Sequence, residues 1–149
     1  MDITLPEIQL KAIGVVRNEI KEPTHRYSEK VVSEIIIDSS LTEALDNLDE
    51  FSHIIILYWI HLSRRPAPTK VHPRGNPERA LMGVFATRSP SRPNPIGKAT
   101  VRLLERKDNI LKVQGLDAID GTPVLDIKPY IPGYDSVDDA RAPSWMIKR

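Results

Sequence analysis

The amino-acid sequence predicts a mainly β protein with a mostly antiparallel sheet of about seven strands and one short helix. Two observations lead to this prediction. Short runs rich in isoleucine and valine, several with partial alternation of apolar and polar residues, recur along the chain as they do in strands. Long proline- and arginine-rich loops interrupt these runs, and proline continues neither a helix nor a central strand. Chains of this kind close into a barrel or fold as a sandwich.

The predicted strands occupy seven segments of the chain. In order, they are residues 7–17, 31–38, 51–61, 81–87, 98–105, 110–117 and 122–130, the last as a strand or an extended arm. The third segment is almost continuously apolar from Ile54 to Ile60, which indicates burial on both of its faces. The turn Lys-Asp-Asn at 107–109 predicts a hairpin between the fifth and sixth segments.

The one credible helix covers residues 42–48. Ser39 or Ser40 can cap its first turn, and Glu43 lies in that turn, where a negative charge is favourable. An apolar stripe, which we expect to pack on the core, is formed by Leu41, Ala44, Leu45 and Leu48.

Length and composition fit one domain. The 149 residues, 40% of them hydrophobic, predict a single domain (1–149) with its core in about 7–133 and a C-terminal tail in 134–149. The chain has no cysteine, which excludes disulfides and thiolate metal sites. No apolar run reaches the ~18 residues of a transmembrane helix, and Glu7, Lys11 and Arg17 interrupt the first segment too early for a signal peptide. We therefore expect a cytoplasmic protein with no membrane partner.

Basic residues are concentrated in the middle of the chain. Segment 61–107 holds 11 Lys and Arg against two acids, whereas the rest of the chain holds 10 against 18, and the formal net charge is +1. A basic segment between acidic flanks fits a polyanionic partner such as nucleic acid. A small anionic ligand would fit it as well.

The most informative segment is 83–97, with the sequence Gly-Val-Phe-Ala-Thr-Arg-Ser-Pro-Ser-Arg-Pro-Asn-Pro-Ile-Gly. Its three prolines predict a stiff loop, so Arg88 and Arg92 are held on a rigid frame. A planar guanidinium at a fixed position suits the binding of a carboxylate or a phosphate.

Several kinds of site are excluded by motif. The chain has no glycine-rich pattern of a dinucleotide-binding fold or a P-loop, no His-Glu-x-x-His pattern and no serine-hydrolase motif. The four histidines also lack the spacing of a metal site, so we expect no metal ion.

A second dense segment, 115–130, carries three aspartates. Asp117 ends a predicted strand and could bind the two ribose hydroxyls of a nucleoside. Asp120 precedes a glycine in a tight turn, where aspartate is favoured for structural reasons. Asp126 and Lys128 share one face of a strand and can pair with each other.

Three sequence blocks are long and unusual. They are Phe51-Ser-His53, the run 82–97 around the three prolines, and the run 117–130, in which Asp-Gly-Thr-Pro-Val precedes Asp-Ile-Lys-Pro-Tyr. With the opening Ile-Gly-Val-Val-Arg at 13–17, they span nearly the whole chain. In content and order these blocks resemble the TsaA-like domain, which defines the TrmO (formerly YaeB) family of tRNA methyltransferases.

This resemblance implies a fold, an activity and partners. The fold is a small antiparallel β-barrel, usually a homodimer, that binds S-adenosylmethionine without a Rossmann fold. The activity is methylation of N6 of threonylcarbamoyl-adenosine, next to the anticodon in the anticodon stem-loop of tRNA. Lys98 stands where many relatives carry an apolar residue, and a cation near the sulfonium is unfavourable unless it points outward.

The resemblance also implies site residues. Carried over by motif, the cofactor-binding residues are Thr24, His25, Arg26, His61, Leu62, Arg88, Lys98, Gln114, Gly115, Leu116 and Asp117. The residues expected to hold tRNA phosphates or the threonine carboxylate are Arg64, Arg65, Arg74, Arg79 and Arg92, while Tyr130 and Trp59 could stack a base.

The sequence leaves the catalytic base and the function class open. A base should help remove the N6 proton, and the candidates are His61, Asp120 and Asp126. The leading alternative function is a non-catalytic RNA- or nucleotide-binding β-barrel. A weaker alternative is a metal-dependent phosphohydrolase that would use Asp117 together with Asp120 and Asp126.

Overall fold

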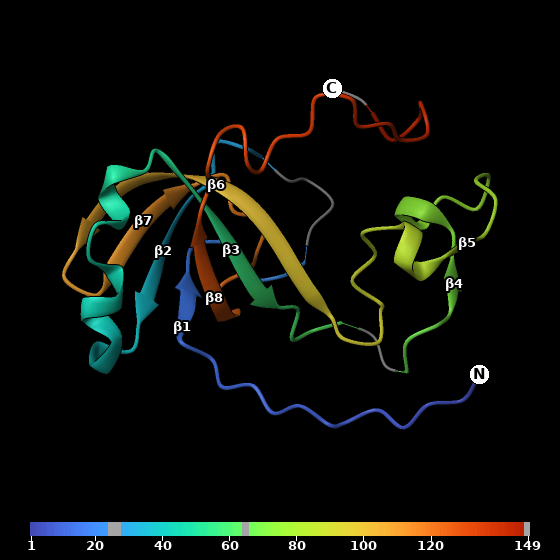
Figure 1. Ribbon diagram of the computed structural model, residues 1–149, viewed down its shortest axis with the longest axis horizontal. Coiled ribbons are helices and arrows are strands. Elements are labelled where there is room, and N and C mark those ends of the chain that lie inside the picture. The colour runs from blue at the N-terminus through green and yellow to red at the C-terminus, as the bar shows by residue number, and fades with distance from the viewer. Residues whose placement is uncertain (24–27, 64–65, 148–149) are drawn as a thin grey trace.

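The computed structural model describes residues 1–23, 28–63 and 66–147. Six strands form a closed barrel in the order β1-β2-β7-β6-β3-β8, with β8 pairing back onto β1 and every neighbouring pair antiparallel (Figure 1). The strands are β1 (Gly14–Arg17), β2 (Val32–Ile37), β3 (His53–Trp59), β6 (Ile96–Lys107), β7 (Ile110–Gln114) and β8 (Pro123–Pro129). The prediction of a mainly β protein built on a small antiparallel barrel is confirmed. Closure leaves this sheet without a free edge.

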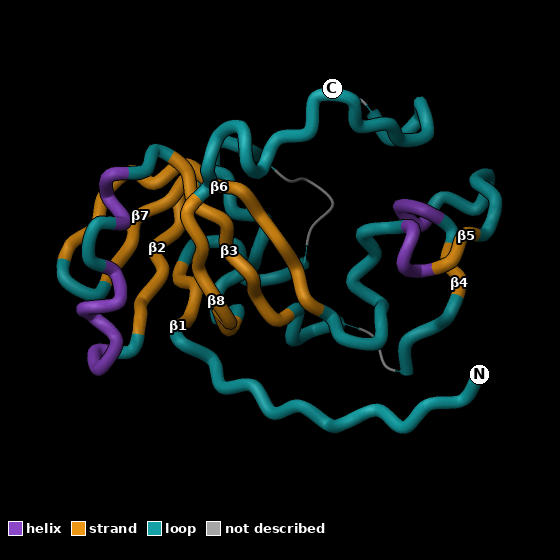
Figure 2. The backbone as a smooth tube through the Cα atoms, in the orientation of Figure 1, coloured by secondary structure: helices purple, strands orange, loops and turns teal. Residues whose placement is uncertain are grey.

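The β6–β7 hairpin turns where the sequence predicts it, but other bounds differ. Of the predicted strand 7–17, only Gly14–Arg17 form β1, because residues 1–12 run as an exposed loop (Figure 2). Ile13, just before β1, is partly buried, and its backbone still bonds to Val124 and Asp38. β6 is longer at both ends than the predicted strand, since β3 and β7 give it partners from Ile96 to Lys107.

The predicted short helix is present with different bounds, as two 3₁₀ helices. These are η1 (Ser39–Leu45) and η2 (Leu48–Glu50). The cap of η1 is Asp38 rather than a serine, since its Oδ1 accepts a hydrogen bond of 2.9 Å from the backbone nitrogen of Ser40. Asn47 separates the two helices in a left-handed conformation, at φ 71°. No helix in the described residues has the length and apolar character needed to cross a membrane.

A lobe stands beside the barrel (Figure 1), and we use this name for residues 66–92. It contains the two-stranded sheet of β4 (Lys70–Val71) and β5 (Met82–Gly83) and the 3₁₀ helices η3 (Pro73–Gly75) and η4 (Val84–Ala86). The predicted strand 81–87 is therefore wrong beyond β5. β4 offers only two partner residues, and the chain then turns at η4, where Thr87 N donates to Val84 O at 3.1 Å.

Branched apolar side chains fill the barrel. β3 is buried on most of its length, as its continuous apolar run predicts. Its pairing with β8 shifts register between Leu57 and Tyr58, a β-bulge that lies close to the end of the strand. The core includes the fully buried side chains of Ile35, Ile54, Ile56, Leu111, Val113 and Val124.

A buried asparagine after β1 connects the segments at one end of the barrel. Asn18 is 8% exposed, and its Nδ2 donates to Ser33 Oγ at 3.0 Å and to the carbonyl of Ala118 at 2.8 Å. Its Oδ1 accepts from Ile20 N at 2.9 Å, and its backbone nitrogen donates to Asp120 Oδ1 at 3.0 Å. Asn18 therefore holds the segments 18–20 and 118–120 together.

Candidate functional site

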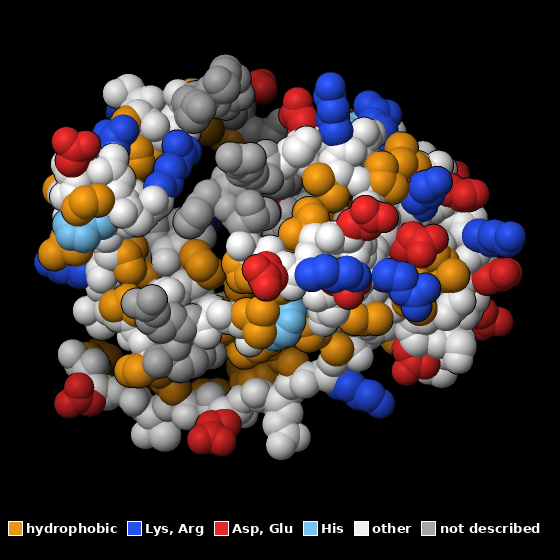
Figure 3. All heavy atoms as spheres, turned by 180° about the vertical axis from the view of Figure 1, so that it is seen from behind, with side chains coloured by type: hydrophobic (Ala, Val, Ile, Leu, Met, Phe, Trp, Pro, Cys, Tyr) orange, Lys and Arg blue, Asp and Glu red, His pale blue; other side chains and the backbone are white. Residues whose placement is uncertain are grey.

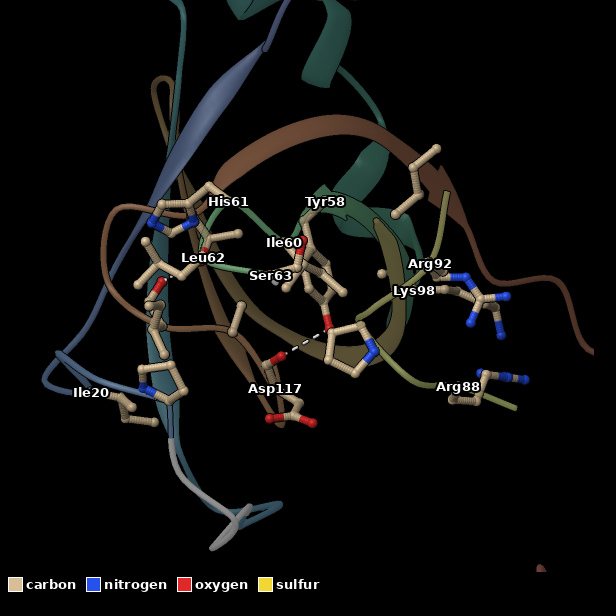
Figure 4. A pocket seen from close by; sticks show the side chains of 17 residues that line it. Ile20, Tyr58, Ile60, His61, Leu62, Ser63, Arg88, Arg92, Lys98 and Asp117 are labelled. Atoms are coloured by element: carbon tan, nitrogen blue, oxygen red, sulfur yellow. Dashed lines mark hydrogen bonds between the residues drawn. The ribbon is translucent and has the colours of Figure 1, made fainter. Parts of the chain in front are cut away.

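A cavity of about 660 Å³ opens at that end of the barrel (Figure 4). Its walls come from four parts of the chain, within 20–23, 58–63, 88–98 and 117–122. These are the segment after Asn18, the end of β3, the proline-rich loop with the start of β6, and the segment between β7 and β8. A cavity of this size holds a ligand such as a nucleoside derivative.

One side of the cavity is cationic. The side chains of Arg88, Arg92 and Lys98 lie together there (Figure 4). Arg92 turns back onto its own loop, where its Nη1 donates to the carbonyls of Thr87 and Ser89 at 2.9 and 3.0 Å. Arg88 and Lys98 are exposed and take part in none of the ion pairs between described residues. Two arginine side chains thus border the cavity, and one of them is anchored to the backbone.

Asp117 lies on another wall of the same cavity (Figure 4). Water reaches its carboxylate, but the cavity walls displace part of the hydration shell. This burial raises the pKa of the Asp117 carboxyl above its ordinary value. Arg88 and Asp117, which are far apart in the sequence, therefore border one cavity, as the proposed nucleoside site requires.

Apolar residues complete the lining. They come from all four parts of the chain and include Ile20, Ile60, Ile96 and Ile119. Together with the charged groups, they make a surface that fits a ligand with flat apolar and charged portions. The sequence offered no signal for them, because isolated isoleucines in this chain are equally typical of the core.

Tyr58 connects the end of β3 to the Asp117 segment. Its hydroxyl donates to the backbone carbonyl of Asp117 at 2.8 Å (Figure 4). The ring packs over Gly97, its partner residue on β6. A Cβ atom at Gly97 would lie 2.9 Å from the Tyr58 hydroxyl oxygen and closer still to two ring carbons. Glycine is needed here because the ring occupies the space of a side chain.

We expect Gly97→Ala to displace Tyr58 and, with it, the Asp117 carbonyl. Overpacking of this kind costs about 1–3 kcal/mol of stability, and it also deforms the cavity. Urea unfolding and ligand titration of the variant would measure both effects. Gly83→Ala is a matched control, because a Cβ atom there meets nothing within 4 Å and the residue has φ −56°. Equal losses in the two variants would contradict the role given to the Tyr58 ring.

Five of the predicted cofactor-binding residues border the cavity. They are His61, Leu62, Arg88, Lys98 and Asp117. Gln114, Gly115 and Leu116 lead from β7 to Asp117 and do not line it; the Leu116 side chain is fully buried in the core. Thr24, His25 and Arg26 lie outside the described residues. Lys98 lies on the same side of the cavity as the two arginines (Figure 4).

The three candidate bases lie in different surroundings. His61 lines the cavity. Asp120 does not; the hydrogen bond from Asn18 N, aided by Lys21 at 3.0 Å, lowers the pKa of its carboxyl and gives it the structural turn role. Asp126 pairs with Lys128 at 2.9 Å, as their shared strand face predicts. Of the three candidates, His61 is the one that borders the cavity.

The residues assigned to RNA are spread out. Arg74 and Arg79 are exposed on the lobe, and the guanidinium of Arg79 lies 4.5 Å from the centroid of the Trp145 ring. Arg92, which we expect to hold a tRNA phosphate or the threonine carboxylate, borders the cavity. Arg64 and Arg65 lie outside the described residues.

The two residues considered for base stacking lie away from this cavity. Tyr130 N donates to the carbonyl of His53, at the opposite end of β3. With about 3.3 Å per residue, that places it roughly 20 Å from the cavity end of the strand. Trp59 lines a second cavity of about 420 Å³, beside Ile8 and Leu10 of the N-terminal segment.

The described residues give no support to the metal-dependent alternative. They contain no group of three or more histidine or acidic side chains that could hold a metal ion. Asp120 and Asp126 each pair with a lysine, and Asp117 stands apart from both of those pairs.

Comparison with known proteins gives consistent matches. Residues 18–136 match the family described as tRNA-methyltransferase O N-terminal domain. The chain is 47% identical over 139 residues to a probable S-adenosyl-L-methionine-binding protein of Archaeoglobus fulgidus, which covers 90% of this chain and 37% of that protein. It is 42% identical over 153 residues to the tRNA (adenine(37)-N6)-methyltransferase of Escherichia coli, covering 93% and 64%.

A solved structure is also similar. The crystal structure of TrmO from Pseudomonas aeruginosa superimposes with a TM-score of 0.78 at 32% identity, over 97% of this chain and 64% of that one. The chain thus spans less than two thirds of the length of each of these three proteins.

Proposed function

The chain belongs to the tRNA-methyltransferase O N-terminal domain family, and we therefore propose that it transfers a methyl group from S-adenosylmethionine to N6 of an adenosine in tRNA. The observation that carries this proposal is the single cavity at one barrel end that Arg88, Asp117 and His61 all border. The E. coli relative, a tRNA (adenine(37)-N6)-methyltransferase, supports the same target.

We extend the proposal to the substrate and the assembly. The target is threonylcarbamoyl-adenosine next to the anticodon, held in the anticodon stem-loop, and the protein acts as a homodimer. The substrate carries a carboxylate on its threonine, which suits a site with two guanidinium groups. Light scattering in solution would test the dimer.

The residues of the cavity fit the cofactor. Arg88 would bind its carboxylate, Asp117 would accept hydrogen bonds from the ribose hydroxyls, and the isoleucines would contact the adenine ring. When bound, S-adenosylmethionine supplies an electrophilic methyl group on a sulfonium. The protein's task is then to hold the acceptor nitrogen in line with that group, since methyl transfer depends mostly on positioning.

The acceptor nitrogen needs to lose its proton. His61 lines the cavity, whereas Asp120 and Asp126 are each held in an ion pair with a lysine. A neutral imidazole has one ring nitrogen that can accept a proton. We therefore assign His61 as the general base.

The test is a transfer reaction with labelled cofactor. The substrate is tRNA that carries threonylcarbamoyl-adenosine without the N6 methyl group. It is incubated with the protein and S-adenosylmethionine bearing a deuterated methyl group, and the digested nucleosides are analysed by mass spectrometry. The label should appear in threonylcarbamoyl-adenosine. Binding of the cofactor and the tRNA without any transfer would favour the non-catalytic RNA-binding barrel instead.

We expect Asp117→Asn to weaken cofactor binding roughly tenfold, because a charge-assisted hydrogen bond becomes a neutral one. The same substitution should not lower stability at pH 7. The folded protein raises the pKa of this carboxyl, so the wild-type loses stability as pH rises from the unfolded value through the folded one. The asparagine variant has no carboxyl group at this position and therefore does not lose this stability.

Urea unfolding at pH 4 and at pH 7, with calorimetric titration of the cofactor, measures both effects. The stability of the asparagine variant relative to wild type should be greater at pH 7 than at pH 4. A variant that is less stable at pH 7 and binds the cofactor normally would contradict both roles.

A further inference from the structure

The lobe presents an exposed aromatic ring on a fixed backbone. Phe85 is 79% exposed, although both Val84 before it and Thr87 after it are buried. The turn that carries it is anchored, because Val84 N donates to the carbonyl of Thr69 at 2.9 Å and the Thr87 hydroxyl donates to the carbonyl of Val84 at 2.8 Å. The ring therefore stands in solvent without packing against the protein.

The surroundings of this ring are basic. Residues 66–92 contain five Lys and Arg against one acid, Glu78. Lys70 and Arg74 are exposed and take part in none of the ion pairs between described residues. Seen from behind, the lobe brings basic and hydrophobic side chains together beside a hollow of the surface (Figure 3).

The lobe is continuous with the cavity. Its last part supplies Arg88 and Arg92 to the cavity wall. Phe85 precedes Arg88 by three residues, a span of at most about 10 Å even for an extended chain. Phe85 therefore lies within reach of a ligand that extends from the cavity toward the lobe.

Chemistry at N6 of a base in RNA requires that the base leave its stack. The next base then loses a stacking neighbour, and proteins that bind unpaired RNA commonly offer an aromatic ring in its place. A second copy of this chain is a poorer occupant, because two basic lobes would repel each other and protein interface cores are depleted of charge.

We propose that the ring of Phe85 stacks on an unpaired base adjacent to the target adenosine, while Lys70 and Arg74 bind the neighbouring phosphates. This inference rests on the proposed function of the cavity. It assigns the lobe as the surface that receives the RNA strand on its way into the site.

The test measures binding of a fluorescently labelled anticodon stem-loop RNA by anisotropy. Phe85→Ala should raise the Kd about tenfold, in line with the loss of one stacked base. Phe85→Tyr should bind as the wild type does, whereas Phe85→Leu, which keeps apolar bulk without an aromatic face, should bind as the alanine variant does. The Kd for S-adenosylmethionine should stay unchanged in all three.

Tyr134 provides the matched control. It is an aromatic residue 82% exposed, but acidic residues follow it at Asp135, Asp138 and Asp139. Tyr134→Ala should bind the RNA normally. Circular dichroism of each variant checks that the fold is intact.

Two outcomes overturn the inference. Unchanged RNA affinity in Phe85→Ala excludes stacking, and a changed oligomeric mass by light scattering assigns the ring to contact between copies. If the wild-type protein methylates tRNA and Phe85→Ala binds RNA normally, the inference is refuted and the proposed function stands. A wild-type protein that binds the RNA without methylating it refutes the proposed function, and the Phe85 comparison then still decides whether the lobe receives RNA.

Discussion

Asn18→Ala should lower the free energy of unfolding by about 2–4 kcal/mol. The substitution removes three side-chain hydrogen bonds of a buried residue and leaves the three partner groups without them. Those partners are the Ser33 hydroxyl, the Ala118 carbonyl and Ile20 N, and they come from three separate segments. The loss should extend beyond stability, because Ile20 and Ala118 also border the cavity.

Urea unfolding measures the first effect, as a lower midpoint with a similar slope. Cofactor titration measures the second. Asn94→Ala is the control. It is the same substitution at an exposed position, where a side chain that loses its amide group remains in contact with water. A midpoint within experimental error of the wild type would mean that solvent replaces the Asn18 contacts without cost.

Arg88→Ala should weaken binding of S-adenosylmethionine by about 1.5–3 kcal/mol, which is roughly 10- to 150-fold in Kd. The physical reason is the loss of a charge-assisted hydrogen bond to the carboxylate of the cofactor. Stability should hardly change, because Arg88 is exposed and takes part in none of the ion pairs between described residues. Arg88→Lys should recover only part of the affinity, because a lysine ammonium cannot form the bidentate contact.

Isothermal titration calorimetry gives the affinities directly. Arg102→Ala serves as the control, since Arg102 is exposed on β6 opposite His53, at the other end of β3 from the cavity. If both arginine variants bind the cofactor equally, general charge attracts it and Arg88 has no specific role.

Local pattern was enough to predict most of the barrel strands but, apart from the β6–β7 hairpin, not their partners. The apolar runs of β2, β3 and β7 mark them as strands, because branched side chains must be buried on one face or both. Segment 81–87 has the same local pattern, yet only Met82 and Gly83 pair, because the length of the opposing strand decides how far a ladder extends.

The site was predictable in part for a similar reason. Arg88 and Asp117 stand in unusual sequence blocks, whereas Tyr58 is one residue in an apolar run. The position of the Tyr58 ring depends on the absence of a side chain at Gly97, which is more than thirty residues away in the sequence. Sequence spacing also does not tell that the side chain of Arg92 folds back on its own loop.

The pairing of β1 with β8 has a consequence for synthesis of the protein. Gly14 pairs with Val124, a separation of 110 residues (124 − 14). At about 5–20 residues per second, the ribosome needs roughly 5–20 s to make this stretch. During that interval β1 has only β2 beside it, so one edge of β1 stays unpaired in the nascent polypeptide until β8 has been synthesised.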